Sequence, residues 1–362
     1  MEEEQRIRDR CFEYWKTKRT VMYNKIINHF LEWPCHTVEW LPDESDLGGI
    51  GYRSGKKIHD SYLNSTVIPC RWKVLRKIIH EGVVKCVRHM PQNTSYIATK
   101  TVSGEVHIFD HVKHPLEPTP DSVLSEQEGP DLRLLGHRTN VNVYGLSHDK
   151  LSWSKLKKGY LLSGADDSQI FVWDINASPN NVALWSTPRG HNGGVQDVAW
   201  HVKNEHLLGS VGSDKYLSIW DLRQSIQNNP VQSVEAHRDE VTSLSFNPFD
   251  EWTLATGSAD KMVKVFDLRN IYRARYRFTD HRKVVNQVEW SPKNRNLLAS
   301  FCADRKVHQK LLFVHTGHKR AIKEFSWDPN GDWDIASVAE GNDLQTWKMT
   351  NDYDQGRQLS GT

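Results

Sequence analysis

The chain has few cysteines and no long apolar run. Its five cysteines are scattered through 362 residues, and no CxxC pair occurs among them. Such a set forms neither a disulfide framework nor a zinc site, so we expect a reducing compartment and no structural metal. The opening residues MEEEQRIRDR are charged, and no apolar run approaches the length that spans a bilayer. We therefore expect neither a secretory signal nor a membrane segment.

Catalytic motifs and a dominant charge are also missing. The sequence has no glycine-rich phosphate loop, no HExxH and no close Cys/His cluster. Its 47 basic and 45 acidic residues give a formal net charge of +2, so the whole chain is not built to coat nucleic acid. The 14 tryptophans and 38% hydrophobic residues indicate a folded globular protein. These observations predict a protein that is not an enzyme and needs no cofactor.

What the sequence does contain is an internal repeat. Counting from a histidine, a hydroxyl residue follows at +19, an acid at +23 and an aromatic residue at +29. Two units carry this pattern most clearly: His191, Ser210, Asp214 and Trp220 in one, and His237, Thr256, Asp260 and Phe266 in the other. Further copies begin at His80, His137, His281 and His318. Some are incomplete, with Lys310 at the aromatic position and Ser103 or Gly341 at the acidic position.

A histidine, a hydroxyl and a carboxylate could also be a nucleophilic triad. A catalytic triad is needed once, whereas this set recurs in six registers. We therefore interpret it as a structural network, in which the carboxylate orients the imidazole and the other ring nitrogen reaches the hydroxyl.

The segments between these fixed points are typical of short strands. They are rich in Val, Ile, Leu, Phe and Trp and bounded by Gly, Asn, Asp, Ser and Pro, and four fit into each period. The GH or AH that opens each unit and the WD or FD that closes it resemble WD-repeat β-propellers over about residues 37–349. Residues 37–79 predict a seventh, degenerate blade assembled from both ends of the chain, with six blades as the alternative. The expected domains are an N-terminal segment 1–34, a propeller 35–349 and a tail 350–362.

The N-terminal segment TVMYNKIINHFLEWP predicts an α-helix docked on the propeller edge. Thr20 is a plausible N-cap, and Pro34 stops the helix. An apolar stripe at helical spacing consists of Tyr23, Ile26, Ile27, Phe30 and Leu31. The plainer interpretation is that this stripe only packs against the propeller.

The order of motifs along the chain resembles one subfamily of propellers. LEWP and WLPD are followed by HEG, RHMPQN, IATKT, PDLRLLGH, DVAWH, SFNP, ATGSADK and DLRN. This series closely resembles the retinoblastoma-binding histone chaperones, the family of the small subunit of chromatin assembly factor, over nearly all the chain except residues 44–75. The resemblance implies a non-catalytic, nuclear histone-binding scaffold shared by chromatin assembly, deacetylase, remodelling or Polycomb-type complexes. A propeller that has lost histone binding is an alternative.

The resemblance implies two binding surfaces, and both depart from the family pattern. The first is a groove between the helix stripe and an acidic loop, which takes a helix of histone four. Here the loop is missing, because DRKV at 304–307 runs directly into HQKLLFVH. The second is the top of the central channel, which takes basic peptides such as the tail of histone three.

The channel positions that the resemblance identifies carry few carboxylates. They are Tyr144, Glu240, Glu340, Asn142, Gln196, Thr242 and Asn286, with Val83, Lys85 and Val284 at further positions. Fewer carboxylates predict weaker binding of a cationic tail.

A nucleic-acid-binding protein is the rival class. Residues 71–89 and 269–283 are basic with interleaved Trp, Tyr and Phe, which suits the grip of a nucleic-acid backbone. The plainer interpretation is that alternate strand residues face solvent and are basic, so that any contact with nucleic acid is indirect.

Overall fold

A computed structural model places most of the repeat region. It describes residues 23–30, 36–40, 77–78, 80, 83–101, 103–115, 129–138, 150–177, 185–187, 190–224, 229–302, 306–309, 313–315, 317–318, 320–331, 334–340 and 343–349. All regular secondary structure within these ranges is β-strand. None of the described residues belongs to a helix long and apolar enough to cross a membrane. The predicted all-β propeller is confirmed.

The described strands form six antiparallel sheets of four strands each. Five sheets consist of strands that are consecutive in the chain. The first contains β2 (Val84–Met90), β3 (Asn93–Thr101), β4 (Val106–Asp110) and β5 (Leu132–Leu134). The second contains β6 (Lys150–Trp153), β7 (Tyr160–Gly164), β8 (Ile170–Asp174) and β9 (Trp185–Thr187). The third contains β10 (Val195–Trp200), β11 (Leu207–Gly212), β12 (Tyr216–Asp221) and β13 (Gln232–Glu235).

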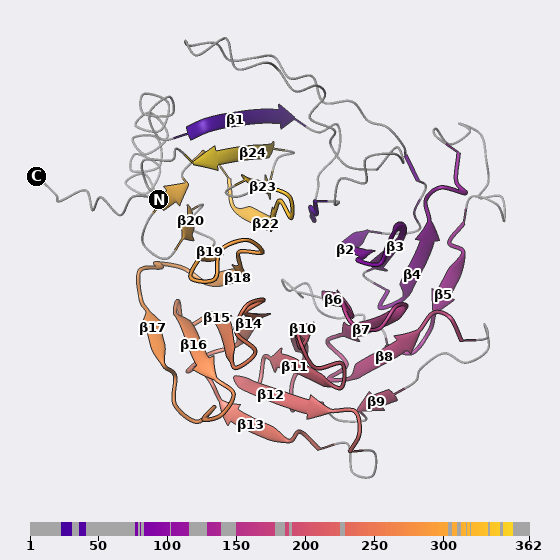
Figure 1. Ribbon diagram of the computed structural model, residues 1–362, viewed down its shortest axis with the longest axis horizontal. Coiled ribbons are helices and arrows are strands. Elements are labelled where there is room, and N and C mark those ends of the chain that lie inside the picture. The colour runs from indigo at the N-terminus through magenta and orange to yellow at the C-terminus, as the bar shows by residue number, and fades with distance from the viewer. Residues whose placement is uncertain are drawn as a thin grey trace, which may run out of the picture.

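The next two sheets continue the series. The fourth contains β14 (Val241–Phe246), β15 (Thr253–Ser258), β16 (Val263–Asp267) and β17 (Tyr276–Phe278). The fifth contains β18 (Val285–Trp290), β19 (Leu298–Cys302), β20 (Lys306–Gln309) and β21 (Phe313–His315). The six sheets surround a central axis, with β2, β6, β10, β14, β18 and β22 innermost (Figure 1).

The sixth sheet joins segments that are more than 300 residues apart in the sequence. It contains β22 (Ile322–Trp327), β23 (Asp334–Ala339) and β24 (Asp343–Met349), and its outermost strand is β1 (Tyr23–Phe30). β1 runs antiparallel to β24 (Figure 1), with Ile26 opposite Trp347 and Phe30 opposite Asp343. The N-terminal part of the chain therefore completes the last repeat by main-chain pairing.

The helix predicted from Thr20 to the proline at 34 is wrong over Tyr23–Phe30, because these residues form β1. A short apolar run with β-branched residues fits either a helix or a strand by its spacing. The outer edge of β24 offers a row of N–H and C=O groups, and pairing with that row overrides the local helical pattern. Thr20, Leu31 and Pro34 lie outside the described residues.

The apolar core lies between neighbouring sheets. In one cluster, Leu217 and Ile219 of β12 pack with Leu244 and Phe246 of β14 and with Phe266 of β16, and all five side chains are buried. Each such fully buried side chain contributes about 1.5–3 kcal/mol relative to an exposed one. Packing of each sheet on the next thus holds the ring together and fixes the inner strands around the channel.

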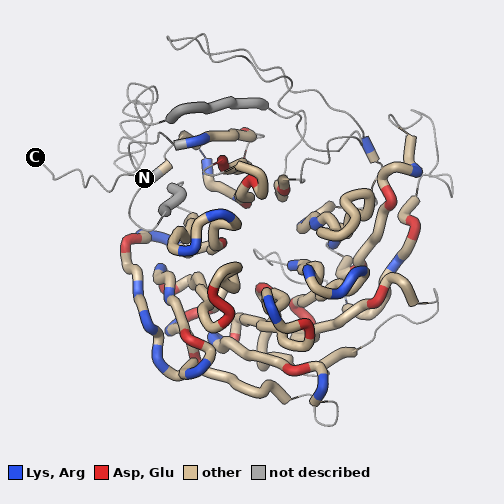
Figure 2. Tube along the Cα trace, viewed as in Figure 1, with Lys and Arg blue, Asp and Glu red and all other residues tan. Residues whose placement is uncertain are grey.

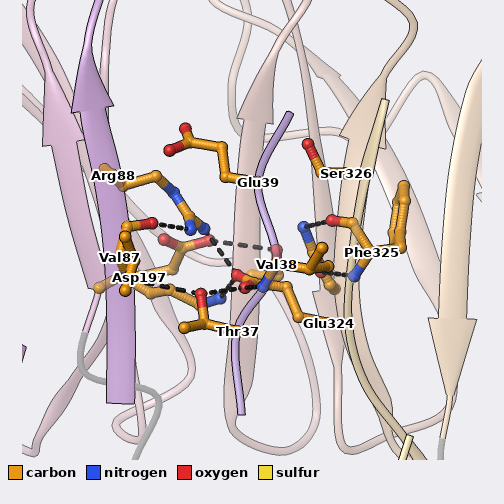
Figure 3. A network of polar contacts seen from close by, with 12 residues as sticks. Thr37, Val38, Glu39, Val87, Arg88, Asp197, Glu324, Phe325 and Ser326 are labelled. Carbon is orange, nitrogen blue, oxygen red and sulfur yellow. Dashed lines mark hydrogen bonds and ion pairs between the residues drawn. The ribbon is translucent and has the colours of Figure 1, made fainter. Parts of the chain in front are cut away.

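Residues 36–40 lie between β22 and β2, at the gap in the ring (Figures 1 and 3). The main-chain N–H of Val38 donates to Glu324 (2.8 Å), and the carboxylate of Glu39 accepts from the main-chain N–H of His89 (2.7 Å). This segment occupies the place of an inner strand of a seventh sheet. Most of the predicted first blade lies outside the described residues, so seven blades remain a prediction. The chain ends meet in the sixth sheet, the complete unit of His318, and not in the degenerate blade, where we expected them.

Candidate functional site

The repeated histidines lie at hydrogen-bonded corners of the sheets. Nδ1–H of His191 donates to Asp214 (2.9 Å), and Nε2 accepts from the hydroxyl of Ser210 (2.7 Å). The same hydroxyl oxygen accepts from Nε1–H of Trp220 (2.8 Å). Asp214 also accepts from two main-chain N–H groups, those of residues 192 and 216, which closes the turn. Every polar atom of this set has a partner.

The same arrangement recurs in other sheets. His237 contacts Asp260 (3.0 Å) and Thr256 (2.8 Å), while buried Phe266 replaces the tryptophan and makes no hydrogen bond to the threonine. In the second sheet the members are His137, Ser163, Asp167 and Trp173. His80 reaches Thr99 (2.7 Å), and His281 reaches Ser300 (2.8 Å).

The sixth sheet shows a carboxylate that the spacing rule missed. Nδ1–H of His318 donates to Asp343 (2.9 Å), and Nε2 accepts from Ser337 (2.7 Å). The sequence rule placed Gly341 at the acidic position, because the turn between β23 and β24 is longer by two residues. The signal that could have found Asp343 was the intact Trp347 with an acid four residues before it.

These networks do not offer a nucleophile. The hydroxyl residues Ser163, Ser210 and Thr256 are all 0% exposed, so no substrate reaches them. Burial lowers the pKa of His137 to about 4, against the opposing effect of Asp167. Burial alone would raise the pKa of Asp260, but the hydrogen bond from His237 brings it down to about 2. We infer that neutral imidazoles and ionised carboxylates fix the turns.

The predicted channel residues occupy one shared position on successive inner strands. Gln196, Thr242 and Asn286 each sit at a register shift of β10, β14 and β18, and Lys85 and Lys323 sit at the equivalent shifts of β2 and β22. Such bulges bend a strand and re-aim the side chain at the shift. The structure therefore brings these predicted positions into equivalent places around the channel.

The three polar residues at these bulges are buried and offer little to a ligand. Gln196 is 7% exposed, Thr242 3% and Asn286 8%. The hydroxyl of Thr242 contacts the main-chain carbonyls of residues 257 and 285. The Oδ1 atom of Asn286 accepts no hydrogen bond from the described residues. Asn142 and Tyr144 lie outside the described residues.

The opposite part of the rim is cationic. His36 lies near Lys85 and Lys323, and its pKa is lowered first by burial and then by these two ammonium groups. Glu340, one of the carboxylates that the sequence retains, pairs with Lys323 at 2.8 Å. The other, Glu240, is exposed in the turn before β14. The rim therefore has few carboxylates available for a basic peptide.

A buried ion network lies deeper along the channel wall (Figure 3). Glu324 of β22 is 2% exposed, and its Oε1 accepts from Arg88 (2.7 Å) and Lys150 (3.1 Å). Its Oε2 accepts from the main-chain N–H of Val38 and from the hydroxyl of Thr37. Burial alone would raise the pKa of Glu324, but Arg88 and Lys150 bring it down to about 2. One carboxylate thus ties β22, β2, β6 and residues 37–38 together.

The equivalent position on other inner strands also links one strand to the next. Asp197 of β10 accepts from the main-chain N–H of Leu244 (2.8 Å) and from Ser243 (3.1 Å). Gln287 of β18 contacts the main chain of Phe325 (3.0 and 3.1 Å). Sequence reasoning missed this layer. The available signal was a polar residue three positions before the tryptophan or phenylalanine that ends an inner strand.

A cavity of about 200 Å³ opens at this level of the channel. Its lining includes Arg88, Lys150, Asp197, Gln287 and Glu289. Burial raises the pKa of Glu289 to about 8, so its carboxyl group is largely protonated near neutral pH. The channel wall is therefore mixed in charge, with the cations held by carboxylates of the protein itself.

Comparisons with known proteins match both the repeats and the N-terminal segment. The family model "WD domain, G-beta repeat" matches residues 183–221, 228–267, 273–309 and 309–348. A second family model, described as that of the "Histone-binding protein RBBP4" or the corresponding component of the CAF1 complex, matches residues 12–66. A chain of a solved structure described as "Crystal Structure of Mitotic Checkpoint Complex" is 20% identical over 77% of this chain and 78% of that one, with a TM-score of 0.59.

The last likeness shows the propeller fold alone, because its identity is low. The two family models carry more information, since one covers the repeats and the other covers the segment that contains β1 and residues 36–40. Together with the ring of sheets, they show that the chain belongs to the WD-repeat family of RBBP4 and its counterpart in the CAF1 complex.

Proposed function

We propose that this chain is a non-catalytic scaffold that binds core histones in the nucleus, as one component of a chromatin complex. The match of residues 12–66 to a histone-binding family model carries the proposal. The matched range includes β1, which completes the sixth sheet, and residues 36–40, which bridge β22 and β2. The buried hydroxyls of the repeated networks support a role without catalysis.

The outer edge of the sixth sheet is the proposed docking site for a helix of histone four. β1 is the end strand of this sheet, and it is drawn from the segment that matches the family model. The groove predicted from the stripe Tyr23, Ile26, Ile27, Phe30 and Leu31 assumed a helix there. We now propose that the partner docks beside the strand, at residues whose main chain is held by β24.

Calorimetric titration with a peptide of the histone-four helix tests this proposal. We expect micromolar binding by the parent protein and at least a tenfold loss in a double variant, Ile27→Asp with Phe30→Asp, because charges on β1 would be desolvated by the partner. A matched control, Leu135→Asp with Val231→Asp, changes two exposed apolar residues on other sheets and should leave binding intact. Absence of binding by the folded parent protein would contradict the proposal.

The channel rim should bind the unmodified tail of histone three only weakly. Lys85, Lys323 and His36 lie at the rim, and the carboxylate of Glu340 is already paired. A cationic peptide would therefore meet like charge and few open carboxylates. The variant Lys85→Glu should bind the tail peptide at least tenfold more tightly than the parent. An unchanged dissociation constant would show that the rim is not where the tail binds.

A further inference from the structure

The outer edge of the fourth sheet carries a concentrated positive charge. Residues 261–283 contain eight Lys and Arg but two Asp, whereas the whole chain has a formal net charge of only +2. Basic residues follow one another along β17 and the turn before it (Figure 2). We call this surface the basic aromatic edge and define it by Tyr272, Arg273, Arg275, Tyr276 and Arg277.

Both aromatic side chains of this edge face solvent. Tyr272 is 74% exposed and Tyr276 is 54% exposed, and the guanidinium of Arg275 lies 5.6 Å from the ring centre of Tyr276. Solvation of a charged face needs no exposed aromatic rings. Two tyrosines among three arginines therefore indicate more than a solubilising surface.

The three arginines have no carboxylate held against them. Among the described residues, no ion pair involves Arg273, Arg275 or Arg277. Arg269, on the same sheet, differs, because Asp267 holds its guanidinium through two hydrogen bonds of 2.6 and 2.9 Å. The charge of the edge is therefore available to a partner, while that of Arg269 is largely satisfied within the protein.

Like charges also face each other across two strands. Lys264 of β16 lies directly opposite Arg277 of β17 in the register of the pair. Burial lowers the pKa of Lys264, and Arg277 and Arg238 lower it further, while Asp260 opposes them. Like charges at directly opposed positions destabilise a sheet, and a bound polyanion would relieve that repulsion.

β17 is also open on one side. It is the end strand of its sheet and pairs only with β16 among the described strands. Arginines on an edge strand can serve to prevent pairing with other chains. That role would need the charges alone, and it does not account for the exposed tyrosines.

We propose that the basic aromatic edge binds single-stranded nucleic acid. The three guanidinium groups contact successive phosphates, and Tyr272 and Tyr276 stack on bases, the combination that sequence-tolerant single-strand binders use. An acidic protein segment would satisfy the arginines but would gain little from two exposed tyrosines. Because this edge lies on a different sheet from β1, it binds independently of the histone-docking site.

Fluorescence anisotropy with a labelled twelve-nucleotide oligouridine tests the proposal on the full chain. Titrations at several salt concentrations compare the parent with Arg273→Ala, Arg275→Ala, Arg277→Ala combined, and with Tyr272→Ala, Tyr276→Ala combined. A matched control removes three exposed cations on other sheets, Lys158→Ala, Lys293→Ala and Arg320→Ala. Thermal melting verifies that each variant is folded.

We expect the arginine variant to bind at least tenfold more weakly, with a salt slope reduced by about 2, since each phosphate contact on a single strand contributes about 0.7. The tyrosine variant should lose roughly tenfold in affinity with its slope unchanged, because stacking releases no counterions. The control should bind like the parent. The proposal is overturned if the parent does not bind, if the control loses as much as the arginine variant, or if the tyrosine variant loses nothing. Equal competition by a polyglutamate peptide would assign the edge to acidic proteins and overturn it as well.

Discussion

Each buried histidine of the repeat satisfies its partners only while its ring is neutral. Nδ1–H of His191 donates to Asp214, and Nε2 accepts from Ser210, whose oxygen accepts from Trp220. A proton on Nε2 would turn that nitrogen into a donor and force the hydroxyl hydrogen away from it. The hydroxyl would then have no acceptor in a buried site, which costs free energy.

The size of each network predicts the cost of removing its hydroxyl. Ser210→Ala leaves both His191 and Trp220 without a partner, and we expect a loss of about 2–4 kcal/mol in the free energy of unfolding. Thr256→Val should lose about 1–2 kcal/mol, because only His237 is left unpaired in that sheet. Urea denaturation measures both.

Ser213→Ala is the control for these variants, since no hydrogen bond of its hydroxyl occurs within the described part of the chain. It should change the free energy of unfolding by less than about 0.5 kcal/mol. Equal losses for the Ser210 and Thr256 variants would show that the tryptophan contact contributes nothing.

Stability should fall as the pH falls below about 6.5. The pKa of His137 is about 4 in the folded chain against 6.5 in the unfolded one, so the unfolded chain binds more protons between these values. That difference amounts to on the order of 3 kcal/mol, fully present above pH 6.5 and lost as the pH falls to 4. His315, buried and stacked on Trp347 at 4.4 Å, has its pKa lowered by burial and acts in the same direction.

Carboxylates such as Asp260 add to this loss only at lower pH, from about 4 toward 2. Urea midpoints measured between pH 7.5 and 4.5 test the histidine contribution. A midpoint that stays constant over this range would contradict neutral, buried imidazoles.

At the scale of elements, the sequence predicted the repeat better than its exceptions. A fixed spacing from His191 and His237 found the strands and the hydrogen-bonded sets, because each set lies within one sheet. Asp343 was missed because the turn before it is longer, and spacing cannot detect an insertion that lies inside a unit. β1 was predicted as a helix because its choice of structure depends on β24, more than 300 residues away.

The network around Glu324 should be a strong joint between elements. Glu324→Gln removes the charge that Arg88 and Lys150 face in a buried site, and we expect a loss of about 3–5 kcal/mol. Glu340→Gln breaks an exposed pair with Lys323 and should cost less than about 1 kcal/mol. Chemical denaturation of the two variants side by side tests the difference, and similar values would mean that the buried charges are not mutually compensated.

Proline substitution tests whether β1 is a strand of the sixth sheet. Ile26→Pro combined with Ile27→Pro removes two N–H groups from β1, at least one of which faces β24, and should cost about 3 kcal/mol or more. Hydrogen exchange of the amides in β24 should accelerate, while exchange in β10–β13 should not change. Unchanged exchange in β24 would indicate that β1 does not pair with it.

At the scale of the whole molecule, the N-terminal segment closes the ring twice. β1 pairs with β24 on the outside, and residues 37–39 contact Glu324, Val87 and His89 on the inside. Those inner contacts join residues up to 287 positions apart, which no local pattern of sequence could indicate. This is why the channel could be predicted only in part. The bulge positions follow the repeat, but the pairing of Arg88 and Lys150 with Glu324 depends on closure.

Closure also separates the proposed binding surfaces. β1 lies on the sixth sheet, the cationic rim lies at the channel, and the basic aromatic edge lies on the fourth sheet. A scaffold of this kind could hold a histone and a nucleic acid at once without competition between them.

Hydrogen–deuterium exchange of the intact chain, with and without a complex of histones three and four, tests the central claim most directly. We predict that the histones slow exchange in β1 and β24 while leaving β10–β13 and β17 unchanged. Protection confined to the channel rim, or no protection anywhere in the folded chain, would contradict a histone scaffold that uses the edge of its sixth sheet.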